Sequence, residues 1–306
     1  MFDMIQAWAE RAQHHEMEQK YLKWADVLPL PLFRFICYVI GIFIYLNQRT
    51  LRLTIIDNMN QLLGKRARRL RKRQVRRYFI HLTKTCFEIL ILTRRFRSSA
   101  VQLKRLFKVQ GEEHIVQALQ SGRGVIVYSP HMGNFFFYYW YLSQRYPCLT
   151  VATPQPDIRF LYDIFAQLGC QGLDYDRTPP LQLFKRLRQH LEGNGVVMLL
   201  GDFYREQFPQ ASWFGKTTKT PIGAAMLALE KQVPIVPFHG RQLGGFRHRI
   251  KFEEPIHLHE QFAREDRLAA MNYLNLQMER MVRETPEQWF YWFQAHERFK
   301  ELSKSF

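Results

Sequence analysis

Residues 124–136 read GVIVYSPHMGNFF, a continuously apolar run followed by a polar turn that contains one histidine, His131. A short apolar run without polar alternation is typical of a strand buried on both faces. Three similar runs follow along the chain: CLTVAT at 148–153, GVVMLLGD at 195–202 and VPIVPFHG at 233–240. Four buried strands of this kind predict a mostly parallel central sheet.

The segments around these strands have apolar residues three and four positions apart, which is the spacing of an amphipathic helix. They read HIVQALQSG, IRFLYDIFAQLG, PPLQLFKRLRQHLEG and PIGAAMLALEKQ. This alternation predicts an α/β fold in which helices flank a mostly parallel central sheet. Ligands of such sheets bind beyond the carboxyl ends of the strands. His131 and Asp202 each follow a predicted strand directly, so we expect them to converge on one site.

Composition limits the class of protein. A chain of 306 residues that is 47% hydrophobic can bury a large core. It carries 44 Lys and Arg against 27 Asp and Glu, a net charge of +17, which favours an anionic partner. The cysteines lack the close pairs that metal sites use and are expected to be reduced core residues facing a cytosolic compartment. They are Cys37, Cys86, Cys148 and Cys170.

An apolar segment near the N-terminus, PLPLFRFICYVIGIFIYLN at 29–47, contains Arg34 as its single charge. About 20 apolar residues are needed to cross a bilayer, so this segment is a marginal span. A signal peptide would start nearer the terminus and end at small residues, which the following QRTLR does not provide. Two interpretations stay open: a retained membrane helix and a buried core helix.

A basic cluster, KRARRLRKRQVRR at 65–77, has nine Lys or Arg and no acid. Such a cluster beside an apolar helix suits the anionic cytoplasmic face of a membrane. Nucleic acid is an unlikely partner because no base-reading module accompanies the cluster. We therefore predict a membrane-associated helical region at 1–104 and an α/β domain at 105–306.

Several standard sites are absent from the sequence. It contains no glycine-rich phosphate loop, no paired cysteine set and no Gly-x-Ser-x-Gly elbow. His257 and His259 alternate along an expected strand after RHRIKFEEP, but the sequence suggests no third ligand. We predict that they are surface residues and that the protein uses neither a metal nor a cofactor.

Three longer segments carry a family resemblance. They are GVIVYSPHMGNFF at 124–136, GDFYREQFPQASWFGKTTKTPIGAAMLALEKQVPIVPFHGR at 201–241 and PEQWFYWFQAHERFK at 286–300. Together with RTLRLTIIDNMNQLLG and CFEIL nearer the N-terminus, they resemble the lipid A late acyltransferases, bacterial inner-membrane enzymes of the lysophospholipid acyltransferase group. The resemblance implies an α/β fold with a membrane-dipping helix at the cytoplasmic face of the inner membrane. It also implies acyl transfer from a carrier-protein or coenzyme A thioester to a hydroxyl of lipid A or a related phosphorylated glycolipid.

The resemblance further implies a catalytic histidine with an acidic residue five positions later. His131, Gly133 and Asn134 match the family motif, but Phe136 occupies the acidic position. Thr153 stands where the family often has an arginine before a proline. Neutralising the orienting carboxylate of a serine-protease triad slows turnover about 10⁴-fold, so the unmodified mechanism would be severely impaired here.

Two acidic residues are candidates to replace the absent carboxylate. They are Asp202, which follows the strand-like run at 195–201, and Glu88, which matches the family acid of CFEIL. Three cations, Arg177, Arg205 and Lys216, are candidates to bind phosphates of the acceptor or carrier, since an arginine fork suits phosphate geometry.

Two classes of function remain open on the sequence. One is an acyltransferase with an altered catalytic pair, or a close variant that transfers an aminoacyl group such as glycyl. The other is a non-catalytic, membrane-bound lipid-binding or scaffold protein. The aromatic run FFFYYWY at 135–141 fits either a remodelled pocket or ordinary core packing.

Overall fold

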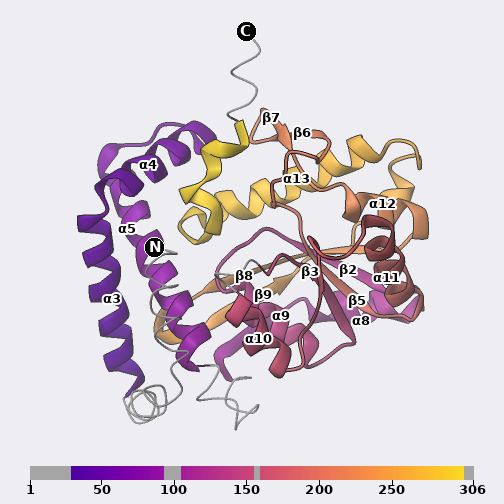
Figure 1. The fold of residues 1–306 in the computed structure, drawn as a ribbon, viewed down its shortest axis with the longest axis horizontal. Helices are drawn as coiled ribbons and strands as arrows, with labels where there is room; N and C mark the ends of the chain where they lie inside the picture. The colour runs from indigo at the N-terminus through magenta and orange to yellow at the C-terminus, as the bar shows by residue number, and fades with distance from the viewer. Residues whose placement is uncertain (1–28, 93–104, 155–158, 300–306) are drawn as a thin grey trace.

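A seven-stranded sheet lies at the centre of the computed structural model, which describes residues 29–92, 105–154 and 159–299 (Figure 1). Its strands are β1 (Phe107–Gln110), β2 (Val125–Ser129), β3 (Cys148–Ala152), β4 (Gln171–Asp174), β5 (Val196–Leu200), β8 (Ile235–Gln242) and β9 (His248–Phe252). Their spatial order is β1-β9-β8-β2-β5-β3-β4, and every neighbouring pair is parallel except β8 with β9. The predicted mostly parallel α/β fold is confirmed.

The four strands expected from the apolar runs are β2, β3, β5 and β8. All five residues of β2 are buried, as an apolar run without alternation predicts. β2 and β5 are direct neighbours in register, with Ser129 opposite Leu200. Their carboxyl ends therefore open at the same edge of the sheet, and the residues that follow each strand meet there.

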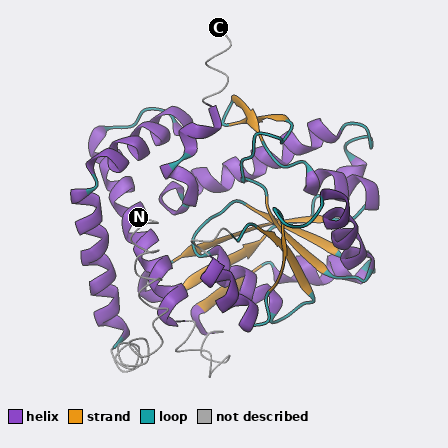
Figure 2. Cartoon of the chain, in the orientation of Figure 1, coloured by secondary structure: helices purple, strands orange, loops and turns teal. Residues whose placement is uncertain are grey.

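Helices cover both faces of this sheet (Figure 2). They are α8 (Glu112–Gln120), α9 (Phe135–Ser143), α10 (Arg159–Gln167), α11 (Pro180–Glu192), α12 (Gly223–Lys231) and α13 (Arg267–Glu284). Four of them, α8, α10, α11 and α12, are the helices that the spacing predicts. The aromatic run forms the unpredicted α9, which has six consecutive buried residues at 137–142. A helix that is apolar all round has no 3.6-residue pattern, because it is buried on every side.

Three helices form the described part of the N-terminal region: α3 (Leu30–Asn47), α4 (Arg49–Leu63) and α5 (Arg68–Phe87), which continues into a π-helical turn at Glu88–Leu92. α3 packs along α5, where a Cβ on Gly41 would lie 2.8 Å from Ile80 Cα, so only glycine allows this close approach. The other side of α3 exposes large apolar side chains, including Phe35, Phe43 and Leu46. Among the described residues, α3 is the one helix long and apolar enough to cross a membrane.

α4 and α5 share a hydrophobic core with the α/β part. Met59 of α4 and Phe79 of α5 belong to the same buried cluster as Trp289 and Trp292 near the C-terminus. The boundary predicted at residue 104 falls in 93–104, outside the described residues. The division into 1–104 and 105–306 stays a prediction.

The remaining elements are a short hairpin between β5 and β8 and a series of 3-10 turns. A hairpin pairs β6 (Gln210–Trp213) with β7 (Lys216–Lys219), and 3-10 turns lie at Gly244–Phe246, Leu258–Glu260, Pro286–Gln288, Phe290–Phe293 and Ala295–Phe299. The prediction of a strand at 257–259 is wrong. β9 ends at Phe252, and Pro255 prevents the strand from continuing. His257 and His259 are half-buried in this turn. A carboxylate oxygen of Glu260 lies within 4.8 Å of ring nitrogens of His257 and His259. The sequence pattern did not indicate this third ligand-type atom.

Candidate active site

His131 and Asp202 form a hydrogen-bonded pair at the carboxyl ends of β2 and β5. The imidazole Nδ1 lies 2.5 Å from Asp202 Oδ1, and the backbone N–H of His131 donates to Asp202 Oδ2 at 2.8 Å. The aspartate side chain is fully buried, whereas 12% of the His131 side chain is exposed. Asp202 thus contacts the imidazole that Phe136 cannot orient.

The backbone of both strand ends holds this pair in place. The N–H of Gly201 donates to Ser129 O at 3.1 Å, so the two turns remain joined just beyond the last strand residues. Gly133 has a φ of +56°, and a Cβ there would lie 2.4 Å from the Tyr138 hydroxyl. Glycine therefore allows both the left-handed turn after His131 and the close packing of α9.

Two residues near the C-terminus complete the surroundings of Asp202. Trp289 Nε1 donates to Asp202 Oδ2 at 2.7 Å, and the buried Arg298 Nη1 donates to the Asp202 carbonyl oxygen at 3.0 Å. Burial by itself would raise the pKa of Asp202, but the charge of His131 and the hydrogen bonds from His131 and Trp289 outweigh it and lower that pKa below its usual value. Burial lowers the pKa of Arg298 to about 10.

Two aromatic rings border the other side of the imidazole. The Tyr291 hydroxyl lies 3.4 Å from His131 Nε2, and the Phe135 ring meets the imidazole edge to face with centroids 4.8 Å apart. Because Asp202 accepts from Nδ1–H, the neutral ring keeps its lone pair on Nε2. This lone pair faces Tyr291.

Glu88, the second acid considered from the sequence, lies in a separate buried network. Its Oε2 accepts from Asn134 Nδ2 at 2.9 Å and from Gln242 Nε2 at 2.8 Å, and its Oε1 lies 3.1 Å from the buried His248 Nε2. No hydrogen bond among the described residues joins Glu88 to His131. The geometry gives no support to the prediction that Glu88 orients the histidine, because the π-helical turn after α5 places the carboxylate against Asn134 instead.

Asn134 caps the N-terminus of α9 and links this helix to Glu88. Its side-chain oxygen accepts from Phe137 N at 3.2 Å and so caps the first turn of α9, while its amide group donates to Glu88. The side chain is fully buried. These contacts fix the turn between His131 and α9.

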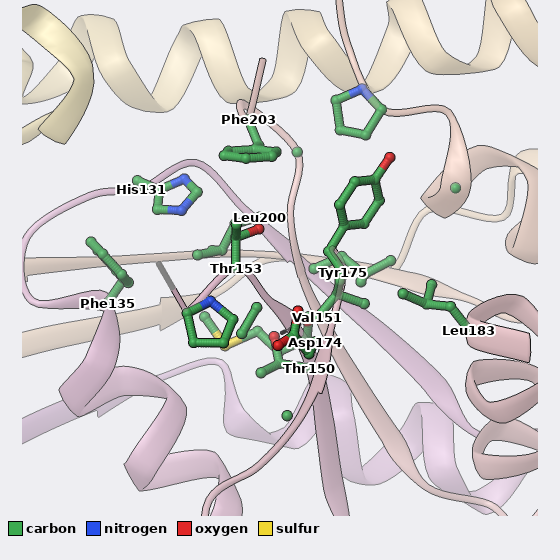
Figure 3. A pocket seen from close by; sticks show the side chains of 18 of the residues that line it. His131, Phe135, Thr150, Val151, Thr153, Asp174, Tyr175, Leu183, Leu200 and Phe203 are labelled. Carbon is green, nitrogen blue, oxygen red and sulfur yellow. Dashed lines mark hydrogen bonds between the residues drawn. The ribbon is translucent and has the colours of Figure 1, made fainter. Parts of the chain in front are cut away.

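A largely apolar pocket of about 1030 Å³ opens beside His131. Figure 3 shows His131 and Phe135 at one side of it, Phe203 near the histidine, and Leu183 at the opposite side. The residue at the absent acidic position, Phe136, lines the same pocket and stacks on Phe165 of α10 with centroids 5.1 Å apart. Thr153, the second departure from the family pattern, is also part of the wall.

The three candidate phosphate-binding cations lie in different places. Arg205 Nη2 contacts the Asp176 carboxylate at 3.2 Å, and the guanidinium stacks on Phe203 of the pocket wall. Arg177 is 70% exposed, with its Nε 3.7 Å from the carboxylate of the pocket-lining Asp174. Lys216 instead donates to Gln61 of α4 at 3.3 Å. The structure thus brings the two arginines to the pocket rim, and Lys216 to the N-terminal helices.

Sequence reasoning assigned no role to Trp289, Tyr291 or Arg298, which surround the His131–Asp202 pair. The signal was present, because all three belong to the quoted segment PEQWFYWFQAHERFK. That segment has no strand or helix periodicity and forms consecutive 3-10 turns. Its residues therefore could not be placed before their tertiary contacts were known.

The chain belongs to the bacterial lipid A biosynthesis acyltransferase family, whose sequence model matches residues 20–301. It is 31% identical to the phosphatidylinositol mannoside acyltransferase of Mycobacterium tuberculosis (strain H37Rv) over 151 residues, 47% of this chain and 46% of that protein. The enzyme of the same name from Mycolicibacterium smegmatis is 32% identical over 135 residues, 42% of this chain and 43% of that protein. The matches span less than half the length of these curated relatives.

One solved structure with a detectable similarity to this chain is the crystal structure of the 1-acyl-sn-glycerophosphate acyltransferase PlsC of Thermotoga maritima. The similarity has a TM-score of 0.36 and 15% sequence identity, and it covers 83% of this chain and 96% of that chain. Membership of the acyltransferase family confirms the resemblance that the sequence segments carry.

Proposed function

We propose that this protein transfers an acyl or aminoacyl group from a carrier-protein or coenzyme A thioester to a hydroxyl of a membrane glycolipid, with lipid A or a related phosphorylated glycolipid as acceptor. The single observation that carries the proposal is the His131–Asp202 pair beside the apolar pocket. Family membership supports the class of reaction.

His131 acts as the general base in this proposal. Asp202 holds Nδ1–H, which leaves the Nε2 lone pair free to take the proton of the acceptor hydroxyl as its oxygen attacks the thioester carbonyl. The buried carboxylate also stabilises the imidazolium that forms. This assigns to Asp202, from the end of β5, the task that a residue at position 136 has in the family pattern.

The pocket receives a hydrocarbon chain of one of the substrates. Its volume lies at the upper end of the roughly 300–1,000 Å³ typical of small-molecule sites, and Phe135, Phe136 and Leu183 contribute apolar surface to it. In fatty-acyl transfer the chain belongs to the donor. In aminoacyl transfer the donor group is small, and the chain belongs to the glycolipid acceptor.

Membrane association supports access to such an acceptor. The exposed apolar side of α3 and the cations of α5 suit an anionic bilayer surface, and we propose the cytoplasmic face of the bacterial inner membrane as the location. Arg205 and Arg177 at the pocket rim are proposed to contact phosphate of the acceptor or the carrier, with Lys216 a candidate farther away.

The test compares the full-length protein with His131→Ala on anionic vesicles that contain lipid A. Acyl and glycyl thioesters of carrier protein and of coenzyme A are the donors, and the mass added to the glycolipid is measured. The matched control is His257→Ala. Its neighbour Ile256 bridges Ile235, the first residue of β8, so His257 lies at the sheet edge opposite the pocket.

General-base catalysis contributes about 10²–10⁴-fold, so His131→Ala should lose at least that factor while His257→Ala retains wild-type activity. The mass of the product identifies the transferred group. A wild-type protein that binds glycolipid but adds no mass with any donor would instead be the lipid-binding or scaffold protein.

A further inference from the structure

Tyr291 is the polar group that lies on the reactive side of His131. Its hydroxyl is 3.4 Å from Nε2, its ring meets the imidazole with centroids 4.7 Å apart, and it lines the apolar pocket. The proposed roles of His131, Asp202 and the two arginines at the pocket rim do not involve this hydroxyl.

The chain on both sides of Tyr291 is held by hydrogen bonds to the active site and to α5. Phe290 N donates to His131 O at 2.8 Å, and the Tyr78 hydroxyl donates to Phe290 O at 2.7 Å. Trp289, the residue before Phe290, donates a hydrogen bond to Asp202. These bonds fix the backbone at Tyr291 relative to the catalytic pair.

The Tyr291 hydroxyl remains a neutral donor. Burial, with the nearby Asp202 charge, raises the pKa of Tyr291 well above its ordinary value, so the group cannot serve as a base near neutral pH. Its 3.4 Å separation from Nε2 is long for a hydrogen bond, which usually measures about 2.7–3.2 Å to nitrogen. An O–H held this weakly can turn to a stronger acceptor.

The proposed reaction creates a stronger hydrogen-bond acceptor, the thioester carbonyl oxygen, close to the Tyr291 hydroxyl. An acceptor hydroxyl that gives its proton to Nε2 must lie within about 2.6–3.2 Å of it, and the thioester carbonyl carbon within about 3–3.5 Å of that hydroxyl. The carbonyl oxygen is bonded to this carbon and therefore lies in the space that Tyr291 borders. Oxyanion stabilisation requires a preoriented hydrogen-bond donor in that space, and the neutral Tyr291 O–H can serve as one.

We propose that Tyr291 is a further catalytic residue, which donates a hydrogen bond to the thioester carbonyl oxygen as it becomes an oxyanion. This inference rests on the proposed acyl transfer. The acceptor oxygen forms a bond to the carbonyl carbon, its proton passes to His131 Nε2, and the carbonyl π pair moves to the oxygen that Tyr291 holds. When this pair returns, the carbon–sulfur bond breaks and the leaving sulfur takes the proton from Nε2, giving an ester and a thiol.

Tyr291→Phe removes the hydroxyl and keeps the ring. Steady-state transfer is measured with the donor and glycolipid that give product with the wild-type protein. Loss of one oxyanion donor typically costs about 10²–10³-fold in kcat, and we expect a loss of that size. The KM for the donor should stay within about threefold, and the pH profile should keep its shape because the His131–Asp202 pair is intact.

Tyr78→Phe is the matched comparison, since its hydroxyl braces the same segment without reaching His131. A selective loss in Tyr291→Phe, with both variants folded by thermal melting, supports the oxyanion role. An equal loss in both variants, or a shifted pH profile in Tyr291→Phe, would show that the hydroxyl only positions the segment or the imidazole, which overturns the inference. Activity of Tyr291→Phe within about threefold of wild type would overturn it as well. If the wild-type protein transfers nothing, the proposed function and this inference fail together.

Discussion

At the scale of residues, one carboxylate determines how His131 is held. Asp202 accepts three hydrogen bonds, from His131 Nδ1, His131 N and Trp289 Nε1. A fully buried carboxylate with three donors is strongly oriented and stays ionised near neutral pH. Phe136 meanwhile stacks with Phe165, so the position that is acidic in the family pattern is part of an apolar wall here.

Asp202→Asn should reduce transfer by about 10²–10⁴-fold, because the amide cannot stabilise the imidazolium and can favour the wrong imidazole tautomer. The variant should also be less stable by about 1.5–3 kcal/mol, the usual contribution of a hydrogen bond to a charged group. Transfer assays and urea unfolding measure the two effects. Asp266→Asn is the control, since this residue at the start of α13 is exposed and its side chain makes no capping hydrogen bond.

The stability difference between wild type and Asp202→Asn should depend on pH. The pKa of Asp202 is lower in the folded protein than the value of about 3.9 in an unfolded chain, so ionisation stabilises the fold. This contribution is fully present above the unfolded value and is lost as the pH falls through the folded value. Unfolding curves should therefore show a gap between the two proteins that narrows as the pH falls below about 4. A gap that keeps its size or widens below about pH 4 would contradict an ionised Asp202.

At the scale of elements, α3 has two different sides. Phe33, Cys37 and Gly41 are buried on the side that packs against α5, whereas Phe35 and Phe43 are 63% and 64% exposed. A core helix would bury its apolar side chains, so this exposure favours a membrane over the core interpretation that the sequence left open. For contact with a membrane surface, the neighbouring α5 offers cations rather than apolar side chains.

Phe35→Asp with Phe43→Asp should weaken binding of the full-length protein to anionic vesicles at least tenfold. Burial of each phenylalanine contributes roughly 1.5–3 kcal/mol, and the introduced charges add an unfavourable desolvation. Vesicle sedimentation measures the loss. Leu276→Asp on α13, also exposed at 58%, should bind like the wild-type protein.

Raising the salt concentration separates the two contributions of this region. Exposed cations are screened beyond about 10 Å at 0.1 M ionic strength, so salt should weaken the α5 contribution and leave the apolar contribution of α3. Complete release of the wild-type protein at high salt would contradict insertion of α3.

At the scale of the whole molecule, the pocket is built from segments far apart in the chain. His131 follows β2, Phe165 belongs to α10, Leu183 to α11 and Phe293 to a C-terminal turn, and all of them line it. The apolar wall and His131 are therefore parts of one cavity. Changes far from His131 should alter which chain fits without altering the chemistry.

Leu183→Trp adds volume at the side of the pocket opposite His131. We expect it to shift the preference toward shorter hydrocarbon chains, with the activity on the best chain within about tenfold of wild type. The measurement is transfer with donors and acceptors of graded chain length, and Leu276→Trp on the surface of α13 is the control. An unchanged chain-length profile would show that the hydrocarbon chain lies elsewhere.

Most of the fold followed from local patterns in the sequence. The runs that became β2, β3, β5 and β8 are apolar without alternation, and the helices between them have the 3.6-residue spacing. α9 was not predicted, because six consecutive buried aromatic and apolar residues leave no periodic signal. The alternation of His257 and His259 predicts a strand where the structure has a turn, because alternating polarity alone does not reveal the interruption at Pro255.

The amino-acid sequence alone determined the α/β class, the apolar and basic N-terminal segments, the family resemblance and the position of His131 just after a buried strand, since each depends on residues close together in the chain. Only the tertiary structure decided which acid reaches the imidazole. Asp202 is 71 positions from His131 and Glu88 is 43 positions away, and sequence separation does not distinguish them. The pairing of β2 with β5 brings Asp202 to Nδ1, while the π-helical turn after α5 brings Glu88 to Asn134. Strand order and helix packing are long-range properties of the fold, and for that reason the site became defined only in three dimensions.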